Sequence, residues 1–318
     1  MKNIVSLSIL ILISSLSFGQ TFKISGSIID SQNHQVLSYA SVMVFNHPIG
    51  ISTDKKGYFE LTLPDSLKMD SLVITYIGYK PRHLCINVLN NDSIVLDPIT
   101  INLSEVFIKP SPKKPKSIIV NEFKIKECEI TYSKEPFNGK GTLYLPYRAK
   151  EPSIESIYIP YEQSYGSLTK IKEIWIYLKS FNSTPTFSRL RIFKAGNGLK
   201  PTEDLLTDPI DLIVAEKSQL LKIDLGKYNL SLPGTGLFVG VEVLIIPENA
   251  REFQNNLGDN TTLYSPFLYY FPAEESEYKF WLFSKGTWVM HSQAVPEYLT
   301  RKPKNLFYKP AISLVLSE

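Results

Sequence analysis

Hydrophobic and polar residues alternate with a period of two along the first third of the chain. Segments 22–26, 40–44 and 58–63 place apolar side chains at every second position, which is the spacing of strands buried on one face. Segment 72–76 is more continuously apolar, as expected of a central strand. Turn residues separate these segments, and no stretch keeps a helical period for ten residues. The pattern predicts a small antiparallel β-sandwich over residues 20–108.

The last 200 residues or so also alternate, but with longer connections between the apolar segments. Glycine and proline mark the turns. We predict an all-β fold here too, a jelly-roll-like sandwich over residues 119–318. Its predicted strands are Ser156–Ile159, Lys172–Leu178, Arg189–Ala195, Leu220–Asp224, Gly236–Ile246, Tyr278–Phe283, Trp288–Met290 and Ala311–Leu316.

A Lys/Pro segment, residues 109–118, separates the two blocks. Three prolines among four lysines between Lys109 and Lys116 cannot donate to a sheet ladder, and their like charges favour an extended chain. The segment is best interpreted as a semi-rigid linker. A basic contact for an acidic surface is the other interpretation.

The N-terminus has the features of a secretory signal peptide, residues 1–19. Lys2 is followed by an apolar run over residues 4–16, and Ser17 and Gly19 supply small residues at a cleavage site. An uncleaved anchor is the alternative, although the run is short for a membrane span. We expect an exported protein, located in the periplasm, at the outer membrane or outside the cell. No later segment has 18 uninterrupted apolar residues, so we expect no transmembrane segment in the mature chain.

Composition excludes some classes of function. The formal net charge of +3 gives no electrostatic footprint for nucleic acid, which we do not expect as a partner. The chain is 43% hydrophobic and 20% charged, which is typical of a packed globular protein. No motif calls for a cofactor, and none is predicted.

Two cysteines, Cys85 and Cys128, lie on either side of the linker. An exported protein can keep a disulfide, and a bridge here would clamp the two blocks together. Two separate buried thiols are the alternative, because the sequence does not show whether the Cα atoms come within about 7 Å of each other.

Several spaced motifs of the first block occur together in one known family. Gly26–Asp30, Ser38–Val44, Thr53–Phe59 and Thr75–Tyr79 resemble the carboxypeptidase-regulatory-like domain, and Leu103–Val106 looks like its exit. The resemblance implies a seven-stranded, transthyretin-like sandwich without a catalytic role. Such domains are fused to many exported proteins, outer-membrane receptors among them.

The second block resembles the C-terminal sandwich often found behind this domain. The similarity lies in Asn197–Pro201, Ile223–Asn229 and Leu237–Glu242. The function of that sandwich is not established, so the resemblance implies a fold and little else.

The residues of the first block that stand out have structural explanations. Asp54 can accept backbone N–H bonds in a turn, Gly57 can adopt positive φ, and Phe59 directs the next strand into the core. Gly78 marks a bulge or bend. A single carboxylate is weak grounds for a Ca²⁺ site, so no metal is predicted at Asp54.

Two activities found among relatives of this domain are excluded. The zinc peptidases need a His-x-x-Glu pair, and none of His34, His47, His83 and His291 is followed by glutamate at the third position. The receptors need a barrel of about 22 strands, each about 10 residues long, which the roughly 200 residues after the linker cannot supply.

Aromatic residues of the second block suggest a binding surface. Trp175 and Tyr177 share one face of a predicted strand, and Trp281 and Trp288 lie in a predicted hairpin. Flat rings can stack on sugars, which makes these four residues candidate ligand contacts. Packing in the core of a sandwich is the competing and commoner explanation.

No catalytic residue is predicted. The chain lacks Gly-x-Ser-x-Gly, and no set of carboxylates is marked by spacing. We therefore expect an exported, non-enzymatic binding or scaffolding protein of the cell envelope whose second domain contacts a glycan or a partner protein. The alternative is a glycan-active hydrolase that uses a carboxylate pair among Glu155, Glu162, Glu173 and Glu242.

Overall fold

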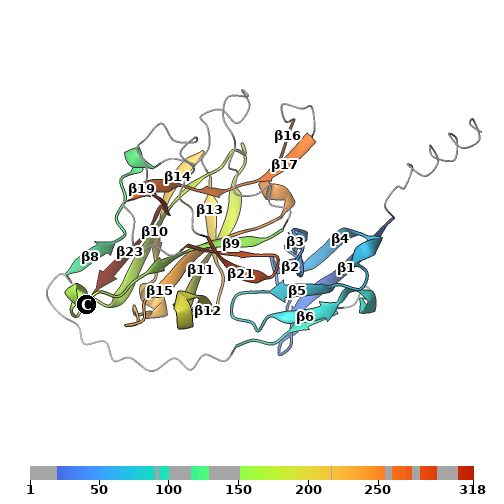
Figure 1. Ribbon diagram of the computed structural model, residues 1–318, viewed down its shortest axis with the longest axis horizontal. Coiled ribbons are helices and arrows are strands. Elements are labelled where there is room, and N and C mark those ends of the chain that lie inside the picture. The colour runs from blue at the N-terminus through green and yellow to red at the C-terminus, as the bar shows by residue number, and fades with distance from the viewer. Residues whose placement is uncertain are drawn as a thin grey trace, which may run out of the picture.

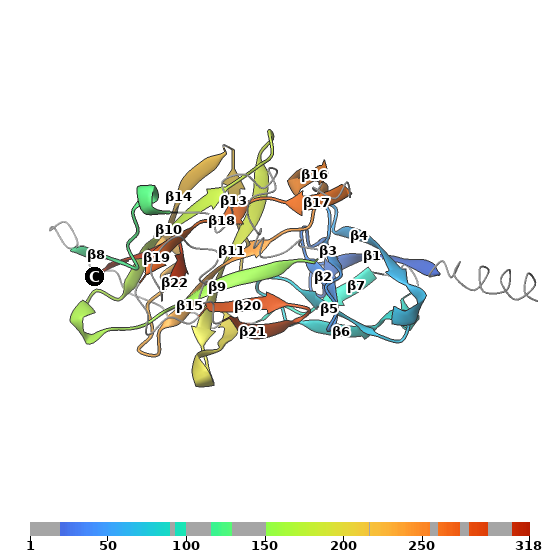
Figure 2. The ribbon, with the colours of Figure 1, turned by 45° about the horizontal axis from the view of Figure 1, so that its top comes forward.

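The computed structural model describes residues 20–89, 93–99, 116–128, 151–215, 217–254, 260–273, 280–291 and 307–318. The predicted signal peptide and most of the predicted linker lie outside these ranges. Within them the chain consists of strands and a few single 3₁₀ turns, and the all-β prediction is confirmed. Figures 1 and 2 show two sandwiches side by side, the first blue to cyan and the second green to red.

The first sandwich has seven strands in two sheets, as predicted. One sheet has the order β4-β1-β7, with β1 and β7 parallel, and the other has the order β3-β2-β5-β6. The bounds are β1 (Thr21–Asp30), β2 (Ser41–Val44), β3 (Gly50–Ser52), β4 (Tyr58–Pro64), β5 (Ser71–Thr75), β6 (Arg82–Cys85) and β7 (Ser93–Leu96), with 3₁₀ turns η1 (Asp65–Leu67) and η2 (Ile86–Val88).

Alternating side chains build the core of the first sandwich. Ile28, Phe59 and Leu72 are buried between its two sheets. Strand β2 is buried on both faces, however, and so is most of β5. Val73, which faces away from the core, lies against Gly286 of the second sandwich, and its cross-strand neighbour Met43 is also buried.

The second sandwich packs a five-stranded sheet against a seven-stranded sheet. The first has the order β14-β10-β23-β8, with β18 also paired to β10. The second has the order β12-β11-β15-β9-β20-β21, with β13 also paired to β11. The bounds are β8 (Ser117–Val120), β9 (Ser153–Ile159), β10 (Lys170–Lys179), β11 (Thr186–Ala195), β12 (Pro201–Asp204), β13 (Ile210–Val214), β14 (Ser218–Asp224), β15 (Leu237–Val243), β18 (Phe267–Leu268), β20 (Phe280–Ser284), β21 (Thr287–His291) and β23 (Ile312–Ser317).

All eight predicted strands of this block are present, with shifted ends. Strand β8 begins at Ser117, inside the predicted linker, and pairs with β23. Two further ribbons were not predicted, β16 (Ala250–Gln254) with β17 (Asn260–Tyr264), and β19 (Tyr270–Ala273) with β22 (Phe307–Pro310). Single 3₁₀ turns complete the block: η3 (Ile125–Glu127), η4 (Gln163–Tyr165), η5 (Asn197–Leu199), η6 (Gly226–Tyr228) and η7 (Pro247–Asn249).

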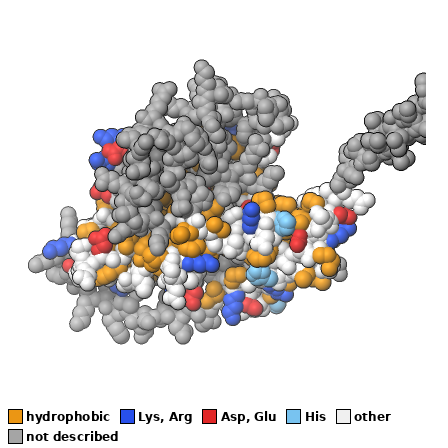
Figure 3. Space-filling view, in the orientation of Figure 1, with side chains coloured by type: hydrophobic (Ala, Val, Ile, Leu, Met, Phe, Trp, Pro, Cys, Tyr) orange, Lys and Arg blue, Asp and Glu red, His pale blue; other side chains and the backbone are white. Residues whose placement is uncertain are grey.

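Two surface properties bear on function. No helix in the described ranges is long and apolar enough to span a membrane. On the face shown in Figure 3, charges of both signs are scattered among the described side chains and form no continuous patch of one sign. That distribution agrees with the near-neutral composition.

Candidate functional site

The two faces of the seven-stranded sheet contact different partners. Along β9, β11 and β15, every second side chain points to the five-stranded sheet, as Ile157, Leu190 and Val239 do in the core. The alternate side chains point away, and we call the surface they form the outer face. It comprises Ile154, Ser156, Tyr158, Arg189, Arg191, Phe193, Phe238, Gly240, Glu242, Trp281, Phe283 and Trp288.

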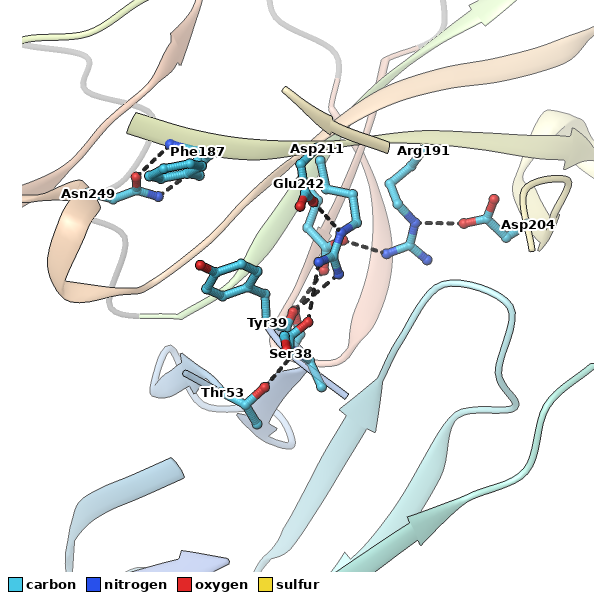
Figure 4. Close-up of polar contacts among 12 residues, drawn as sticks. Ser38, Tyr39, Thr53, Phe187, Arg191, Asp204, Asp211, Glu242 and Asn249 are labelled. Atoms are coloured by element: carbon cyan, nitrogen blue, oxygen red, sulfur yellow. Dashed lines mark hydrogen bonds and ion pairs between the residues drawn. The ribbon is translucent and has the colours of Figure 1, made fainter. Parts of the chain in front are cut away.

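Half of the outer face is a charge network, formed by Arg189, Arg191, Asp204, Asp211 and Glu242 (Figure 4). Arg191 Nε donates to Asp204 Oδ2 at 2.6 Å, and Arg191 Nη1 donates to Glu242 Oε2 at 2.8 Å. Arg191 and Glu242 are only 5% and 2% exposed. Charges this deeply buried are tolerated only when they are paired and hydrogen-bonded.

The charge network extends across to the first sandwich. Ser41 Oγ on β2 donates to Glu242 Oε1 at 2.7 Å. Arg189 donates to the backbone carbonyls of Tyr39, at 3.2 Å, and Ser38, at 3.4 Å. Its guanidinium also lies 5.0 Å from the centroid of the Tyr76 ring. The network therefore binds the two sandwiches to each other.

The pKa shifts differ between the two buried carboxylates of this network. Burial alone would raise the pKa of Glu242, but the charges of Arg191 and Arg189 and the Ser41 hydroxyl outweigh it, and the pKa is lowered. At Asp204, burial raises the pKa more than Arg191 lowers it. The two carboxylates overcome desolvation at Arg191 and raise its pKa. Arg191 therefore stays charged, and this arrangement is suited to fixing geometry rather than to moving a proton.

Backbone contacts continue the interface beside the charges. Ser52 N donates to the Ile245 carbonyl at 3.1 Å, and Ile245 N donates to Ser52 Oγ at 3.1 Å. Tyr39 is buried beside Leu244 and Ile246 of the second sandwich. A Cβ on Gly50 would lie 2.9 Å from Pro152 Cδ, so glycine is needed for this close approach.

The β20–β21 hairpin is anchored to the first sandwich at its tip. The Lys285 carbonyl accepts a hydrogen bond from Asn46 N at 3.0 Å. Glu151, which is buried, accepts from Ser284 Oγ at 2.7 Å and from Lys285 N at 2.9 Å. Burial raises the pKa of Glu151, and these two donors oppose the rise. Gly286 lies directly against Val73, so the hairpin covers the back of the first sandwich.

The other half of the outer face is an aromatic cluster, formed by Tyr158, Phe193, Phe238, Trp281, Phe283 and Trp288. Phe193 and Phe238 are buried as its floor, and the other four rings are half-buried around them. The Arg191 guanidinium lies 5.1 Å from the centroid of Phe193, which joins the cluster to the charge network.

The aromatic cluster shows that the outer face is concave. Phe193 on β11 and Trp288 on β21 are separated by four steps across the sheet, which at about 4.8 Å per step is about 19 Å. Their ring centroids are nevertheless only 5.1 Å apart, in an edge-to-face arrangement. The rings can meet only because the sheet curls toward this side.

One polar atom of the aromatic cluster is unsatisfied. Trp281 Nε1 is buried and has no hydrogen-bond acceptor in the described part of the chain. A buried donor without an acceptor costs about 1–3 kcal/mol.

The structure divides the four predicted ligand contacts between two sheets. Trp281 and Trp288 belong to the aromatic cluster. Trp175 and Tyr177 lie on β10, on the side of the five-stranded sheet that faces away from the core. The four residues therefore cannot contribute to one site.

The Trp175 and Tyr177 side chains already have partners within the chain. Lys222 Nζ lies 3.9 Å from the centroid of the Trp175 ring, and Trp175 Nε1 donates to Glu173 Oε2 at 2.7 Å. Tyr177 stacks on Tyr269 with ring centroids 4.1 Å apart. These contacts leave this pair less available to a ligand than the concave face.

The predicted turn residues of the first sandwich have local roles. Asp54 Oδ1 accepts from Lys56 N at 2.8 Å and from Tyr58 N at 2.9 Å, and Gly57 has φ of 72°. Phe59 is buried in the core. Gly78, with φ of 76°, packs against the backbone of Thr207 in the second sandwich. Gly78 thus serves the interface, a role that the sequence did not suggest.

Cys85 and Cys128 are free thiols, so the bridge considered from the sequence is not formed. Cys85 ends β6 and is exposed, whereas Cys128 follows η3. Figures 1 and 2 both place β6 and the β8 region at opposite ends of the molecule, which explains why the two thiols do not meet.

The candidate hydrolytic carboxylates have separate surroundings. Glu155 faces the core side of its sheet and accepts from Tyr270 Oη at 2.6 Å, and burial raises its pKa although this hydrogen bond opposes the rise. Glu242 is in the charge network, Glu173 accepts from Trp175, and Glu162 accepts from Ser164 Oγ at 3.1 Å. The described residues contain no group of three or more His, Cys, Asp or Glu side chains that could hold a metal ion.

Sequence reasoning missed the charge network. Arg189 and Arg191 alternate with the apolar Leu190 and Ile192. Such alternation is the usual pattern of a strand with one solvated face. The only sequence signal was an arginine pair on a strand that precedes several acidic residues.

Comparison with known proteins gives one family match. Residues 24–108 match the family described as CarboxypepD_reg-like domain. No curated protein matches the chain. A solved protein of Bacteroides fragilis NCTC 9343, of unknown function and provisionally described as membrane-associated, is 10% identical over 94% of this chain and 98% of its own, with a TM-score of 0.20. That TM-score is too low to indicate a shared fold. The first sandwich of this chain is therefore a CarboxypepD_reg-like domain.

Proposed function

We propose that the chain is an exported, non-enzymatic binding protein of the bacterial cell envelope, and that the concave outer face of its second sandwich binds a glycan. The observation that carries this proposal is the aromatic cluster. Its half-buried rings surround a buried aromatic floor on a concave surface. Ring faces of this kind stack on the apolar faces of sugars.

In this proposal the first sandwich fixes the shape of the binding face. It holds one end of the β20–β21 hairpin, which carries three rings of the aromatic cluster, Trp281, Phe283 and Trp288. It also covers the charge network next to the cluster and adds hydrogen bonds to Glu242 and Arg189. A preformed face loses less conformational entropy when a ligand binds.

The test is a glycan array probed with the mature two-domain chain, its Trp288→Ala variant and its Trp175→Ala variant. We expect Trp288→Ala to weaken binding at least about tenfold, or about 1.4 kcal/mol. Trp175→Ala is the matched control, because this tryptophan lies on the other sheet. No binding to any glycan would refute the proposal, and loss of binding in Trp175→Ala alone would place the site on the five-stranded sheet.

The alternative of a glycan-active hydrolase is decided on the same glycans. A hydrolase that uses Glu155 or Glu242 would release shortened products from a bound glycan, and mass spectrometry of the array eluate would detect them. A binding protein returns the glycan intact.

A further inference from the structure

Strand β21 ends the seven-stranded sheet on the side of the hairpin. Within the described residues it pairs only with β20, and Figure 2 shows it at the margin of the sheet. An edge strand presents unpaired N–H and C=O groups, and proteins usually protect such an edge with charged side chains or proline. At the opposite end of the same sheet, β12 carries the exposed Glu203.

Among the described residues, β21 has no such protection from Thr287 to Met290, the four residues that precede its last one, His291. Its residues from Thr287 to Met290 include no charged side chain and no proline. Val289 is 49% exposed and Met290 is 54% exposed. These two neighbours point to opposite faces of the strand, so the edge is apolar on both sides.

The hairpin register identifies the backbone groups that point outward. Lys285 and Gly286, with φ of 53° and 75°, form a two-residue turn, and Ser284 is opposite Thr287. Residues that flank such a turn exchange both backbone hydrogen bonds, and this pattern repeats at every second residue. The N–H and C=O groups of Val289 therefore point to β20, and those of Trp288 and Met290 point to the free edge.

We propose that β21 pairs antiparallel with β21 of a second copy of this chain, with a two-fold axis at Val289. In this register Trp288 is opposite Met290 of the partner subunit, and the two residues exchange both of their outward backbone hydrogen bonds. The symmetry repeats these bonds on the other side of the axis. Val289 is opposite Val289 of the partner subunit, in the closer, non-hydrogen-bonded type of pair.

The side chains suit this register, which is why a second copy is the expected occupant. A neutral strand can pair with the same strand of a second copy without placing like charges opposite each other. A charged edge such as β12 would bring like charges together in such a pair. The indole of Trp288 meets the thioether of Met290 of the partner subunit, a favourable contact between sulfur and an aromatic ring. The pairing also joins the two concave faces into one surface, and it does not depend on glycan binding.

A single edge strand is a small interface, so the dimer should depend on concentration. Sedimentation velocity of the mature chain over a range of concentrations should show a monomer that converts to a dimer. Val289→Lys should leave only monomer. Ile213→Lys is the matched control, because Ile213 is also a strand residue with 49% exposure, and it should dimerise like the unsubstituted chain. A monomer at all concentrations, or equal loss of dimer in both variants, would overturn the proposal.

A cross-linking experiment tests the register even if Val289→Lys fails to fold. In a Cys85→Ser, Cys128→Ser background, Val289→Cys would place two thiols opposite each other at a spacing that a disulfide can bridge. Oxidation with copper phenanthroline should give a covalent dimer in high yield, whereas Ile213→Cys should give little. Equal yields from the two variants would show random collision and overturn the register.

Discussion

Replacing Glu242 by glutamine removes one charge from the buried network between the sandwiches and keeps the size of the side chain. Arg191 would retain Asp204 at 2.6 Å but lose its second carboxylate, and the new amide would place a donor next to donors from Arg191 or Ser41. Removing one partner of a buried ion pair costs about 3–5 kcal/mol. Because Asp204 remains, we expect the lower end, about 3 kcal/mol.

Thermal and urea unfolding of the mature chain measure this loss. With an unfolding entropy of about 2.1 cal/mol/K per residue, 1 kcal/mol shifts Tm by about 1.6 °C in a chain of about 300 residues, so Glu242→Gln should lower Tm by about 5 °C. Glu203→Gln is the matched control. Its partner Lys194 Nζ is also 2.6 Å away, but both side chains are more than half exposed, so the pair contributes at most about 1 kcal/mol.

The pH dependence gives a second check on Glu242. Its pKa is lowered in the folded state, so the carboxylate stabilises the fold above its ordinary pKa of 4.5, and the stabilisation disappears as the pH falls through the lower folded value. The difference between the unsubstituted chain and Glu242→Gln should be full at neutral pH and shrink in acid. An effect no larger than that of Glu203→Gln, or one that does not change with pH, would refute a stabilising role for the network.

Three further outcomes are expected from single substitutions or labelling. Glu155→Gln should raise the free energy of unfolding at pH 8 by about 0.5–3 kcal/mol. Burial raises the pKa of Glu155, so its charged form lowers the stability of the fold as the pH rises. A gain in stability that persists at pH 4 would contradict this. Gly78→Ala should lower Tm more than Gly166→Ala, since both have positive φ but only Gly78 packs against the other sandwich; equal shifts would argue against that contact. Iodoacetamide at pH 8 should modify exposed Cys85 quickly and Cys128 slowly, because burial raises the pKa of Cys128 to about 11; mass spectrometry that finds both protected would indicate a disulfide.

Local patterns predicted the strands because each strand depends on its own alternation. Segment 58–63 became β4 with its apolar face in the core. No strand was predicted between Pro247 and Pro266, whose asparagines are typical of turns. The structure places the β16–β17 hairpin there, paired by its own backbone bonds. Backbone pairing of this kind leaves little trace in a sequence.

The candidate site could be predicted only in part, because its side chains are buried by parts of the chain that are distant in the sequence. Trp175 and Tyr177 alternate with the apolar residues of one strand. The sequence of that strand therefore places them on the face that points away from the core, where the structure has them. The meeting of Phe193 with Trp288 depends on the curl of a whole sheet. The burial of Arg189 depends on carbonyls from a separate sandwich. No window of sequence contains both partners of either contact.

The same contacts indicate what the first sandwich contributes. Separated from it, the second sandwich would expose Arg191 and Glu242, and water would replace the Ser41 hydroxyl and the Ser38 and Tyr39 carbonyls as partners of the network. The first sandwich would in turn expose Met43 and Val73 on the back of its four-stranded sheet. The first sandwich therefore covers the charge network, and the second sandwich covers apolar surface whose exposure to water would cost stability. The CarboxypepD_reg-like domain of this chain is better understood as a structural part of the concave face than as an independent module in front of it.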